Sequence, residues 1–479
     1  MTKVIAVDLG AESGRVATVE FDGTRFFVEE IHRFANGPVT LRGTMFWNIL
    51  HLWQEISAGI EKAKESAASI GVATWGVDFA LLDRDDNLVA NPVHYRDMRT
   101  EGMMEWVFER IPRREVFERT GIQFLTLNTL YQYSSILRRS PTQLEAARYF
   151  LMMPDLINFW LTGEKVSEFT DATTTQFYNP LLGDWDRQML NRLGLPTHIL
   201  PTIVQPGTRI GAYQGVPVHA PACHDTGSAV VAIPATSPGF AYLSSGTWSL
   251  LGLELPKPVI TDETYAANVT NEGGVEGTFR LLQNIMGLWL AQQCRATWRA
   301  AGTEYTYDEL ARLASEAEPF RSLIFPDDPN FMLPGDMPSR IRDYCARTDQ
   351  PIPETVAQVM RTIYESLALK YRYALDHLIR ISGQTINRMH IVGGGSKNAL
   401  LCQMTADAIG REVVAGPAEG TVLGNAIVQL IAVGALTNVA QARRVLASTI
   451  DAVSYQPKHR EDWEGAYERF RRLVPEASQ

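Results

Sequence analysis

The sequence predicts an α/β protein made of two related domains that face each other across a cleft. Its 479 residues, 45% of them hydrophobic, are enough to bury more than one core. Apolar strands joined by a polar turn occur at the N-terminus and again about half a chain later, which indicates a duplicated architecture. Strand-like and helical segments alternate around these hairpins, a pattern typical of mixed α/β sheets.

Each predicted hairpin presents a polar loop. In the first, residues 4–9 form an apolar strand and residues 15–21 return with alternating character after a glycine-containing turn. In the second, Ser244-Ser245-Gly246-Thr247 is the turn within residues 240–253. Because the two hairpins belong to related domains, we expect their loops to face one cleft.

The boundary between the domains is predicted at 235/236. Residues 232–239 are rich in proline, serine and glycine and lie directly before the second hairpin, as expected for a linker. The predicted domains are therefore residues 1–235 and residues 236–479.

Further elements are expected on both sides of this boundary. The patterns predict strands at residues 69–74, 215–220 and 390–392 and helices at residues 53–65, 356–379 and 399–409. Residues 420–442 carry no charged side chain, but glycines and polar residues interrupt the run. We therefore predict a buried core helix there in preference to a membrane span.

Composition and charge favour a small-molecule partner. The formal net charge of -10 provides no basic surface for nucleic acid or an anionic membrane. The four cysteines lack the paired spacing of a zinc site, so we expect them to be reduced. The chain enters its first strand without a basic segment or cleavage site, so secretion is not expected. We expect a cytoplasmic protein, either monomer or homodimer.

Three glycine-containing loops could hold phosphate groups. Asp8 ends the first strand and could contact a magnesium ion through water, beside a turn with free amides. Ser244-Ser245-Gly246-Thr247 and Gly393-Gly394-Gly395 provide the other two loops, the latter before a helix start. Each loop alone is also compatible with an ordinary turn. The P-loop pattern is absent from the chain, so a nucleotide would be held differently.

Phosphoryl transfer also needs a proton acceptor and a sugar pocket. Asp225 follows a predicted strand, and its carboxylate can accept a proton, although an aspartate before a small-residue helix starting near Ser228 is equally typical of an N-cap. Trp75 and Gly76 offer an indole face and close backbone approach to a sugar, with a core role for Trp75 as the alternative. Arg96 and Asp97 could join this pocket or form a simple ion pair.

These motifs resemble those of the FGGY-type carbohydrate kinases over nearly the whole chain. The resemblance implies two actin-like (RNase H-like) ATPase domains flanking a catalytic cleft. No site is assigned after about Pro457, where the resemblance ends. The matching blocks are residues 7–10, 13–15, 74–79, 95–97, 245–250, 271–274, 284–290 and 391–395.

The resemblance further implies which residues carry the function. Asp225 is the expected proton acceptor. The implied ATP contacts are Ala11, Glu12, Ser13, Gly14, Arg15, Thr247, Gln292 and Gly394. The implied sugar contacts are Gly76, His224, Asp225, Thr226 and Asn284, and from their own chemistry we add Trp75 and Asp78.

The implied activity is the transfer of phosphate from ATP, with Mg²⁺ near Asp8, to the C1 hydroxyl of a ketose. L-Rhamnulose is the expected substrate, in L-rhamnose catabolism. L-Fuculose or another ketose is the enzymatic alternative. A non-catalytic, nucleotide-gated actin-like protein is the alternative from another functional class.

Overall fold

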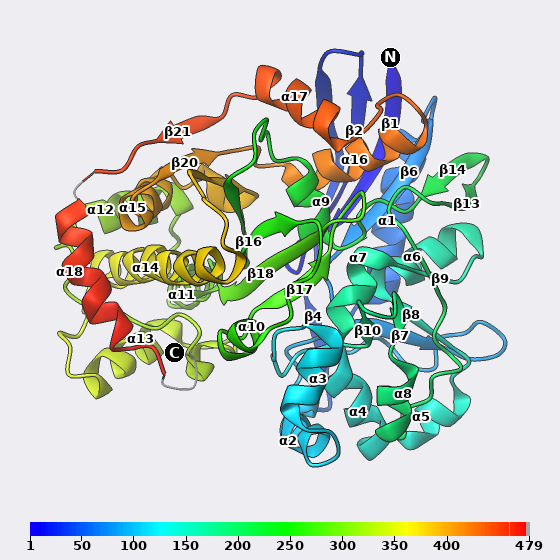
Figure 1. The fold of residues 1–479 in the computed structure, drawn as a ribbon, viewed down its shortest axis with the longest axis horizontal. Helices are drawn as coiled ribbons and strands as arrows, with labels where there is room; N and C mark the ends of the chain where they lie inside the picture. The colour runs from blue at the N-terminus through cyan, green and yellow to red at the C-terminus, as the bar shows by residue number, and fades with distance from the viewer. Residues whose placement is uncertain (459, 476–479) are drawn as a thin grey trace.

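Two separate β-sheets organise the chain (Figure 1). The computed structural model describes residues 1–458 and 460–475. The first sheet has the order β13-β14-β6-β1-β2-β3, formed by β1 (Thr2–Leu9), β2 (Ser13–Phe21), β3 (Phe26–Ala35), β6 (Ser69–Thr74), β13 (Arg209–Tyr213) and β14 (Val216–His219). The second has the order β17-β18-β16-β15-β19-β20-β21, formed by β15 (Phe240–Ser245), β16 (Trp248–Leu255), β17 (Thr270–Gly273), β18 (Phe279–Met286), β19 (Arg388–Val392), β20 (Glu412–Ala415) and β21 (Val453–Tyr455).

The two sheets share one topology. In the first, β1 is antiparallel to β2 and parallel to β6, which in turn is parallel to β14. In the second, β15 is antiparallel to β16 and parallel to β19, which is parallel to β20. Each sheet therefore has an antiparallel meander followed by parallel strands, and the predicted two-domain α/β architecture is confirmed.

Helices cover both faces of the first sheet, which explains why β1 is apolar at consecutive positions. Ile5 and Val7 pack in a cluster with α1 (Ile49–Ala63), whereas Val4 and Ala6 pack with α16 (Gly420–Ala432). Successive side chains of a strand point to opposite faces, so both sets must be apolar when both faces are buried. A helix from the C-terminal half of the chain thus covers a sheet built from the N-terminal half.

The segment predicted as one helix over residues 420–442 consists of two helices. After α16, Gly434 adopts a φ of +77°, a left-handed conformation that ends the helix, and α17 (Val439–Thr449) follows. The polar side chains of α16 have main-chain partners. Asn425 Nδ2 donates to the carbonyls of Val7 and Gly71, and Gln429 Nε2 donates to that of Ile5. The division at 235/236 remains a prediction.

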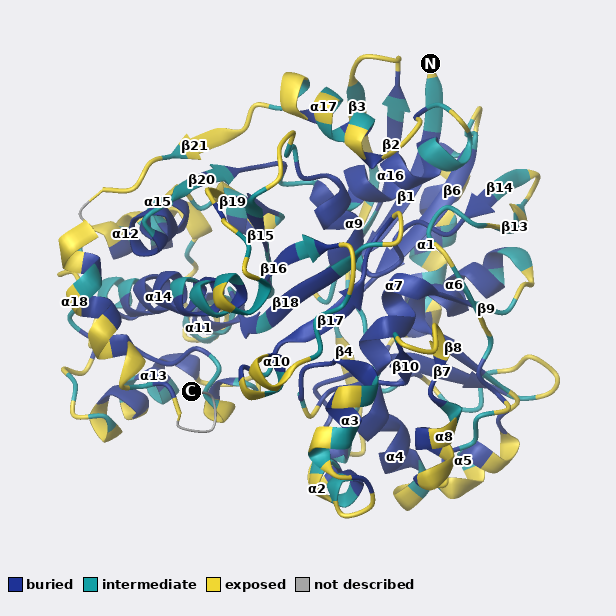
Figure 2. Cartoon of the chain, in the orientation of Figure 1, coloured by how far each residue is buried: buried dark blue, intermediate teal, exposed yellow. Residues whose placement is uncertain are grey.

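The second sheet packs against the long helix α14 (Val356–Ser382), which is largely buried (Figure 2). Thr355 and Gln358 form a capping box at its start, and Gly383 ends it with a φ of +66°. The surrounding helices are α11 (Trp289–Ala300), α12 (Tyr307–Glu316), α13 (Met337–Arg347), α15 (Ala399–Ile409) and α18 (Arg460–Arg471).

The chain between β6 and β13 forms a separate helical region at the lower right of Figure 1, with its own apolar cluster. Its helices are α2 (Met103–Phe108), α3 (Arg113–Thr120), α4 (Thr129–Arg139), α5 (Pro141–Ala146), α7 (Phe169–Ala172) and α8 (Arg187–Arg192). In the same stretch of chain, α6 (Met153–Thr162) packs instead in the apolar cluster of α1 and the first sheet. Short ladders join β7 (Phe79–Leu82) to β8 (Tyr149–Met152), β9 (Val166–Glu168) to β12 (Thr202–Val204), and β10 (Tyr178–Asn179) to β11 (Asp184–Trp185).

The remaining elements are the hairpin of β4 (Pro38–Leu41) and β5 (Thr44–Trp47) and the helices α9 (Asp225–Val231) and α10 (Asp262–Ala266). Cys223, Cys294, Cys345 and Cys402 are buried and unpaired, as predicted. Across the described ranges, no helix combines the length and apolarity needed to cross a membrane.

Candidate active site

A cavity of about 450 Å³ has walls from both sheets and from the helical region. Fourteen of the predicted site residues line it, which are Asp8, Ala11, Glu12, Ser13, Arg15, Trp75, Gly76, His224, Asp225, Thr226, Thr247, Asn284, Gln292 and Gly394. Two predicted residues, Gly14 and Asp78, do not line it. The sheet topology brings the set together, because the turns of both hairpins and the ends of β6, β14 and β19 open toward the same space.

At the end of β1, Asp8 is engaged by Arg15. Both Nε and Nη2 of Arg15 donate to Oδ2 of Asp8, at 2.8 and 2.6 Å. The third guanidinium nitrogen, Nη1, donates to Glu419, which lies directly before α16. Arg15 therefore links the two halves of the chain at the cavity wall.

The first turn lines the cavity beside Asp8 and Arg15. Gly10 N donates to Ser13 O at 2.9 Å and closes the turn. Burial raises the pKa of Glu12, while the charges of Arg96 and Arg295 oppose this increase. Gly14 serves packing, since a Cβ there would overlap the ring of Phe34 on β3.

The second turn is tied to the start of α11. Trp289 N donates to Thr247 O at 3.1 Å, and Gln292 Nε2 donates to Thr247 Oγ1 at 3.3 Å. Oε1 of Gln292 is buried without a hydrogen-bond partner among the described residues. A buried acceptor of this kind is suited to a ligand donor.

The three glycines after β19 have different surroundings. Gly393 has a φ of +83° and, like Gly395, lies against Ser245, where any side chain would collide. A Cβ on Gly394, in contrast, would meet no atom within 4 Å. Gly394 is therefore the member of the loop that leaves space for a ligand in the cavity.

Asp225 is the first residue of α9, so the helix begins three residues before the predicted start. Its carboxylate Oδ1 accepts from Thr226 N at 2.6 Å, and His224 occupies the N-cap position, which was the alternative interpretation of Asp225. The side chain is 29% exposed toward the cavity. Protein surrounds it elsewhere, and this burial raises its pKa, which the charge of His224 lowers and that of Asp8 raises. A raised pKa brings a carboxylate closer to the range useful for a general base.

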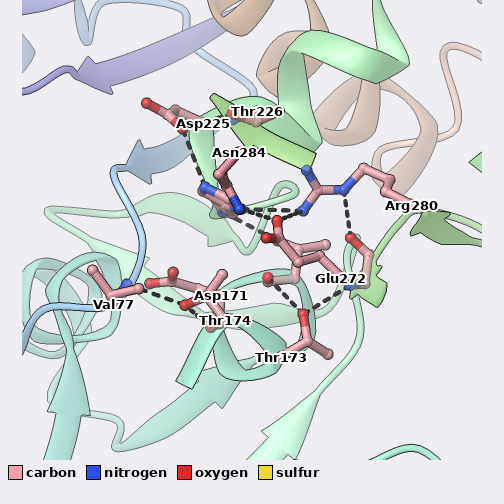
Figure 3. Close-up of polar contacts among 12 residues, drawn as sticks. Val77, Asp171, Thr173, Thr174, Asp225, Thr226, Glu272, Arg280 and Asn284 are labelled. Atoms are coloured by element: carbon pink, nitrogen blue, oxygen red, sulfur yellow. Dashed lines mark hydrogen bonds and ion pairs between the residues drawn. The ribbon is translucent and has the colours of Figure 1, made fainter. Parts of the chain in front are cut away.

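His224 lies between both halves of the chain. Its Nε2 is 3.5 Å from Asp225 Oδ1, and its Nδ1 is 3.3 Å from Glu272 Oε2 on β17 and 3.1 Å from Arg280 Nη2 on β18. Arg280 Nη2 is also 3.2 Å from Glu272 Oε2, and the two side chains point toward each other in Figure 3. Neither Glu272 nor Arg280 was singled out as a functional residue from the sequence.

Asn284 is held by Gln123, a residue without any sequence motif. Gln123 Oε1 accepts from Asn284 N at 2.9 Å and from Nδ2 at 3.2 Å, and its Nε2 donates to Asn284 O at 3.3 Å. Gln123 also lines the cavity. This contact joins the helical region to the second sheet, and no local pattern in the sequence could have indicated it.

Asp78 lies behind the cavity wall. Its Oδ2 accepts from the indoles of Trp47 and Trp75 at 2.6 and 3.1 Å, and its Oδ1 accepts from Gln132 at 2.8 Å. Burial raises the pKa of Asp78 to about 6, although these hydrogen bonds oppose the shift. Trp75 both lines the cavity and packs in the core, so its core role is confirmed and its sugar contact remains a prediction.

Gly76 and Val77 continue this wall. A Cβ on Gly76 would approach the side chain of Thr174 to 3.0 Å, so the glycine permits close packing. Val77 has a φ of +67°, an unfavourable conformation for a β-branched residue. Its N–H donates to Thr174 Oγ1 at 3.1 Å (Figure 3). Thr129 Oγ1 donates to the carbonyl of Val77 at 2.7 Å. Such strain is often found at functional sites.

Arg96 and Asp97 do not form the ion pair that was one interpretation of the sequence. Asp97 accepts from the backbone of Met45 and Arg99, at 2.8 and 2.9 Å. The guanidinium of Arg96 lies 4.0 Å from the ring centroid of Trp289 and donates to Met332 O at 2.6 Å. Both residues stabilise the surroundings of the cavity, whose lining includes the neighbouring Tyr95.

Comparisons with known proteins agree with this geometry. The N-terminal domain model of the FGGY family of carbohydrate kinases matches residues 3–223, and the C-terminal domain model matches residues 241–433. The chain is 46% identical to a rhamnulokinase from Bacteroides thetaiotaomicron, over 98% of this chain and 99% of that protein. It is 42% identical to a rhamnulokinase from Pectobacterium atrosepticum, over 98% and 96%. A ligand-bound xylulose kinase from Lactobacillus acidophilus has the same fold, with a TM-score of 0.80 at 16% identity over 99% of this chain and 98% of that chain.

Proposed function

Because the chain belongs to the FGGY family of carbohydrate kinases, we propose that it transfers the γ-phosphate of ATP to the C1 hydroxyl of L-rhamnulose. The products are L-rhamnulose 1-phosphate and ADP, in the breakdown of L-rhamnose. The observation that supports L-rhamnulose as the substrate is the 46% and 42% identity to two rhamnulokinases over nearly the whole chain. That identity extends beyond the nucleotide loops that sugar kinases share. An L-fuculose kinase and a non-catalytic actin-like protein are not favoured.

Asp225 is the proposed proton acceptor. As the C1 oxygen attacks the γ-phosphorus, its proton passes to the Asp225 carboxylate, and the bond from phosphorus to the leaving oxygen of ADP breaks. Exposure to the cavity, a raised pKa and the hydrogen bond from Thr226 N suit this role. Because the transition state of phosphoryl transfer is loose, positioning and charge stabilisation contribute more than proton removal.

The proposed nucleotide contacts are the turns of both hairpins and the loop after β19. Residues of the first turn, Thr247 and Gln292 line the cavity, and Gly394 leaves space for close backbone approach. Arg15 carries a positive charge suited to a phosphate group. In this structure it forms ion pairs with the carboxylates of Asp8 and Glu419. We expect the triphosphate to compete with Glu419 for Arg15.

Asp8 is the proposed contact for Mg²⁺, through water. When bound, the ion neutralises charge on the phosphate oxygens. Nowhere in residues 1–458 and 460–475 do three or more His, Cys, Asp or Glu side chains form a metal cage. This fits magnesium, which takes most of its ligands from phosphates and water in kinases. Both hydrogen bonds of Arg15 go to Oδ2 of Asp8, which leaves Oδ1 for a hydrated ion.

The proposed sugar contacts line the same cavity as Asp225. Trp75 supplies an apolar face, and His224, Thr226 and Asn284 supply directional polar groups around the cavity. Asp78 acts indirectly, because its hydrogen bond orients the Trp75 indole.

A coupled assay of ADP release across five acceptors tests the proposal. L-Rhamnulose, L-fuculose, L-ribulose, D-xylulose and glycerol are compared at one ATP and Mg²⁺ concentration. We expect the highest kcat/KM for L-rhamnulose and little ATP turnover without sugar. A higher value for another ketose would reject the substrate and retain the kinase. Sugar-independent turnover at the full rate would reject both.

The domain boundary at 235/236, a cytoplasmic location and a monomeric or homodimeric state are also proposals. Light scattering on the purified protein measures the last of these directly.

A further inference from the structure

The imidazole of His224 contacts charged groups that come from the two halves of the chain. Asp225 belongs to the same segment, next to the first sheet, whereas Glu272 and Arg280 belong to β17 and β18 of the second sheet. These two residues are separated from His224 by 48 and 56 positions in the sequence. The cluster is deeply placed, since Glu272 is 4% and Arg280 0% exposed.

Burying the ion pair of Glu272 and Arg280 costs hydration free energy. Two charges removed from water lose hydration, and replacing such a pair by well-packed apolar residues is often neutral or stabilising. The pair is therefore weak evidence for a contribution to stability. Burial raises the pKa of Glu272, but the nearby His224 imidazole and the charge of Arg280 more than offset this and hold it below its usual value. Glu272 is therefore an anion beside the imidazole.

The strand that carries Glu272 is fastened to the opposite half of the chain on both sides of that residue. Asn271 N donates to Gly121 O at 2.9 Å, and Gly273 N donates to Thr173 Oγ1 at 2.7 Å. These contacts fix the position of Glu272 relative to His224. Thr226 N holds the Asp225 carboxylate from the other side.

We propose that Glu272 and Arg280 are positioning residues, through which the second domain orients the His224 imidazole and so sets the orientation of the imidazole toward the Asp225 carboxylate. The proposal rests on the proposed function, in which Asp225 accepts the proton. Neither residue is required to touch the reacting atoms.

The charges around this group determine the expected pH effect. Glu272 on β17 and Arg280 on β18 face His224 directly. The carboxylate of Asp8 on β1 raises the pKa of Asp225, and Asp225 in turn raises the pKa of Asp171 on α7. The charge of His224 lowers the pKa of Asp225, and this effect depends on the short distance, 3.5 Å, between the imidazole and the carboxylate. Removing the Glu272 charge is expected to weaken that effect, so Asp225 would require a higher pH to ionise.

The test is the pH profile of kcat/KM for Glu272→Gln, with L-rhamnulose and saturating ATP. We expect the acid limb to move to higher pH by about 0.5 to 1 unit. We expect kcat to fall roughly 10- to 100-fold, less than removal of the base itself would cause. Glu254→Gln is the matched control, because Glu254 is a partly buried carboxylate of the same sheet that pairs with Arg443 at 2.8 Å. Its acid limb is expected to coincide with that of the wild type.

Glu272→Asp separates charge from packing and remains informative if Glu272→Gln folds poorly in a thermal melt. It retains the negative charge, so we expect a reduced kcat with the wild-type acid limb. A limb that moves as far in Glu272→Asp as in Glu272→Gln, or that moves in neither, overturns the inference. Asp225→Asn, measured in parallel, distinguishes a failure of the positioning role from a failure of the proposed base. If it is inactive, an unshifted Glu272→Gln refutes only the positioning role, whereas an active Asp225→Asn also refutes the proposed base.

Discussion

Replacing Asp225 by asparagine removes the proposed proton acceptor while keeping its shape. The oxygen that accepts from Thr226 N at 2.6 Å is retained, so the side chain is expected to keep its position at the start of α9. General-base catalysis contributes about 10²- to 10⁴-fold, so kcat is expected to fall by this factor. The corresponding increase in the activation barrier is about 2.7 to 5.5 kcal/mol.

Two further measurements make this result specific. The KM for ATP is expected to change little, because the proposed nucleotide contacts lie on other segments. Folding is expected to be preserved, because the substitution removes a carboxylate that lies among the charges of Asp8 and Asp171. A coupled assay gives kcat and both KM values, and a thermal melt verifies the fold. Near-wild-type kcat in a folded Asp225→Asn protein would refute the reasoning and leave Asp225 a structural residue.

Three other predictions follow from the same geometry. Gly394→Val is expected to raise the KM for ATP more than that for sugar, because the new side chain extends into open cavity space. A rise in the sugar KM alone would show that this loop contacts the sugar and not the nucleotide. Asp78 has a pKa raised to about 6 by burial, so the folded state binds its proton more tightly than the unfolded state. The free energy of unfolding should therefore decrease as the pH rises from about 4 to 6, by up to about 1.4 kcal/mol per pH unit. This part of the slope should vanish in Asp78→Asn when denaturation is followed against pH. L-Rhamnulose is expected to exceed L-fuculose in kcat/KM by roughly 10- to 100-fold, because the epimer leaves a buried polar group near Asn284 unsatisfied; equal values would disprove this preference.

The sequence predicted the local elements that place the site. The strand at residues 69–74 and the helix at residues 399–409 have the bounds expected from their patterns, and both hairpins are present. Hydrophobic periodicity and turn residues depend on a few neighbouring positions, so they predict helices, strands and turns without tertiary information. Errors arose at helix ends. α9 begins earlier than expected and α16 ends at Ala432, because each end depends on backbone conformation at one or two residues.

By itself, the sequence determined the two-domain α/β class and a set of polar loops, most of which the structure places around one cavity. Their individual roles remain predictions. Only the tertiary structure decided that Gln123 holds Asn284, that Glu272 and Arg280 approach His224, and that α16 covers the first sheet. The physical reason is that a hydrophobic pattern specifies which face of an element is buried, whereas its partner depends on how two sheets distant in sequence pack together.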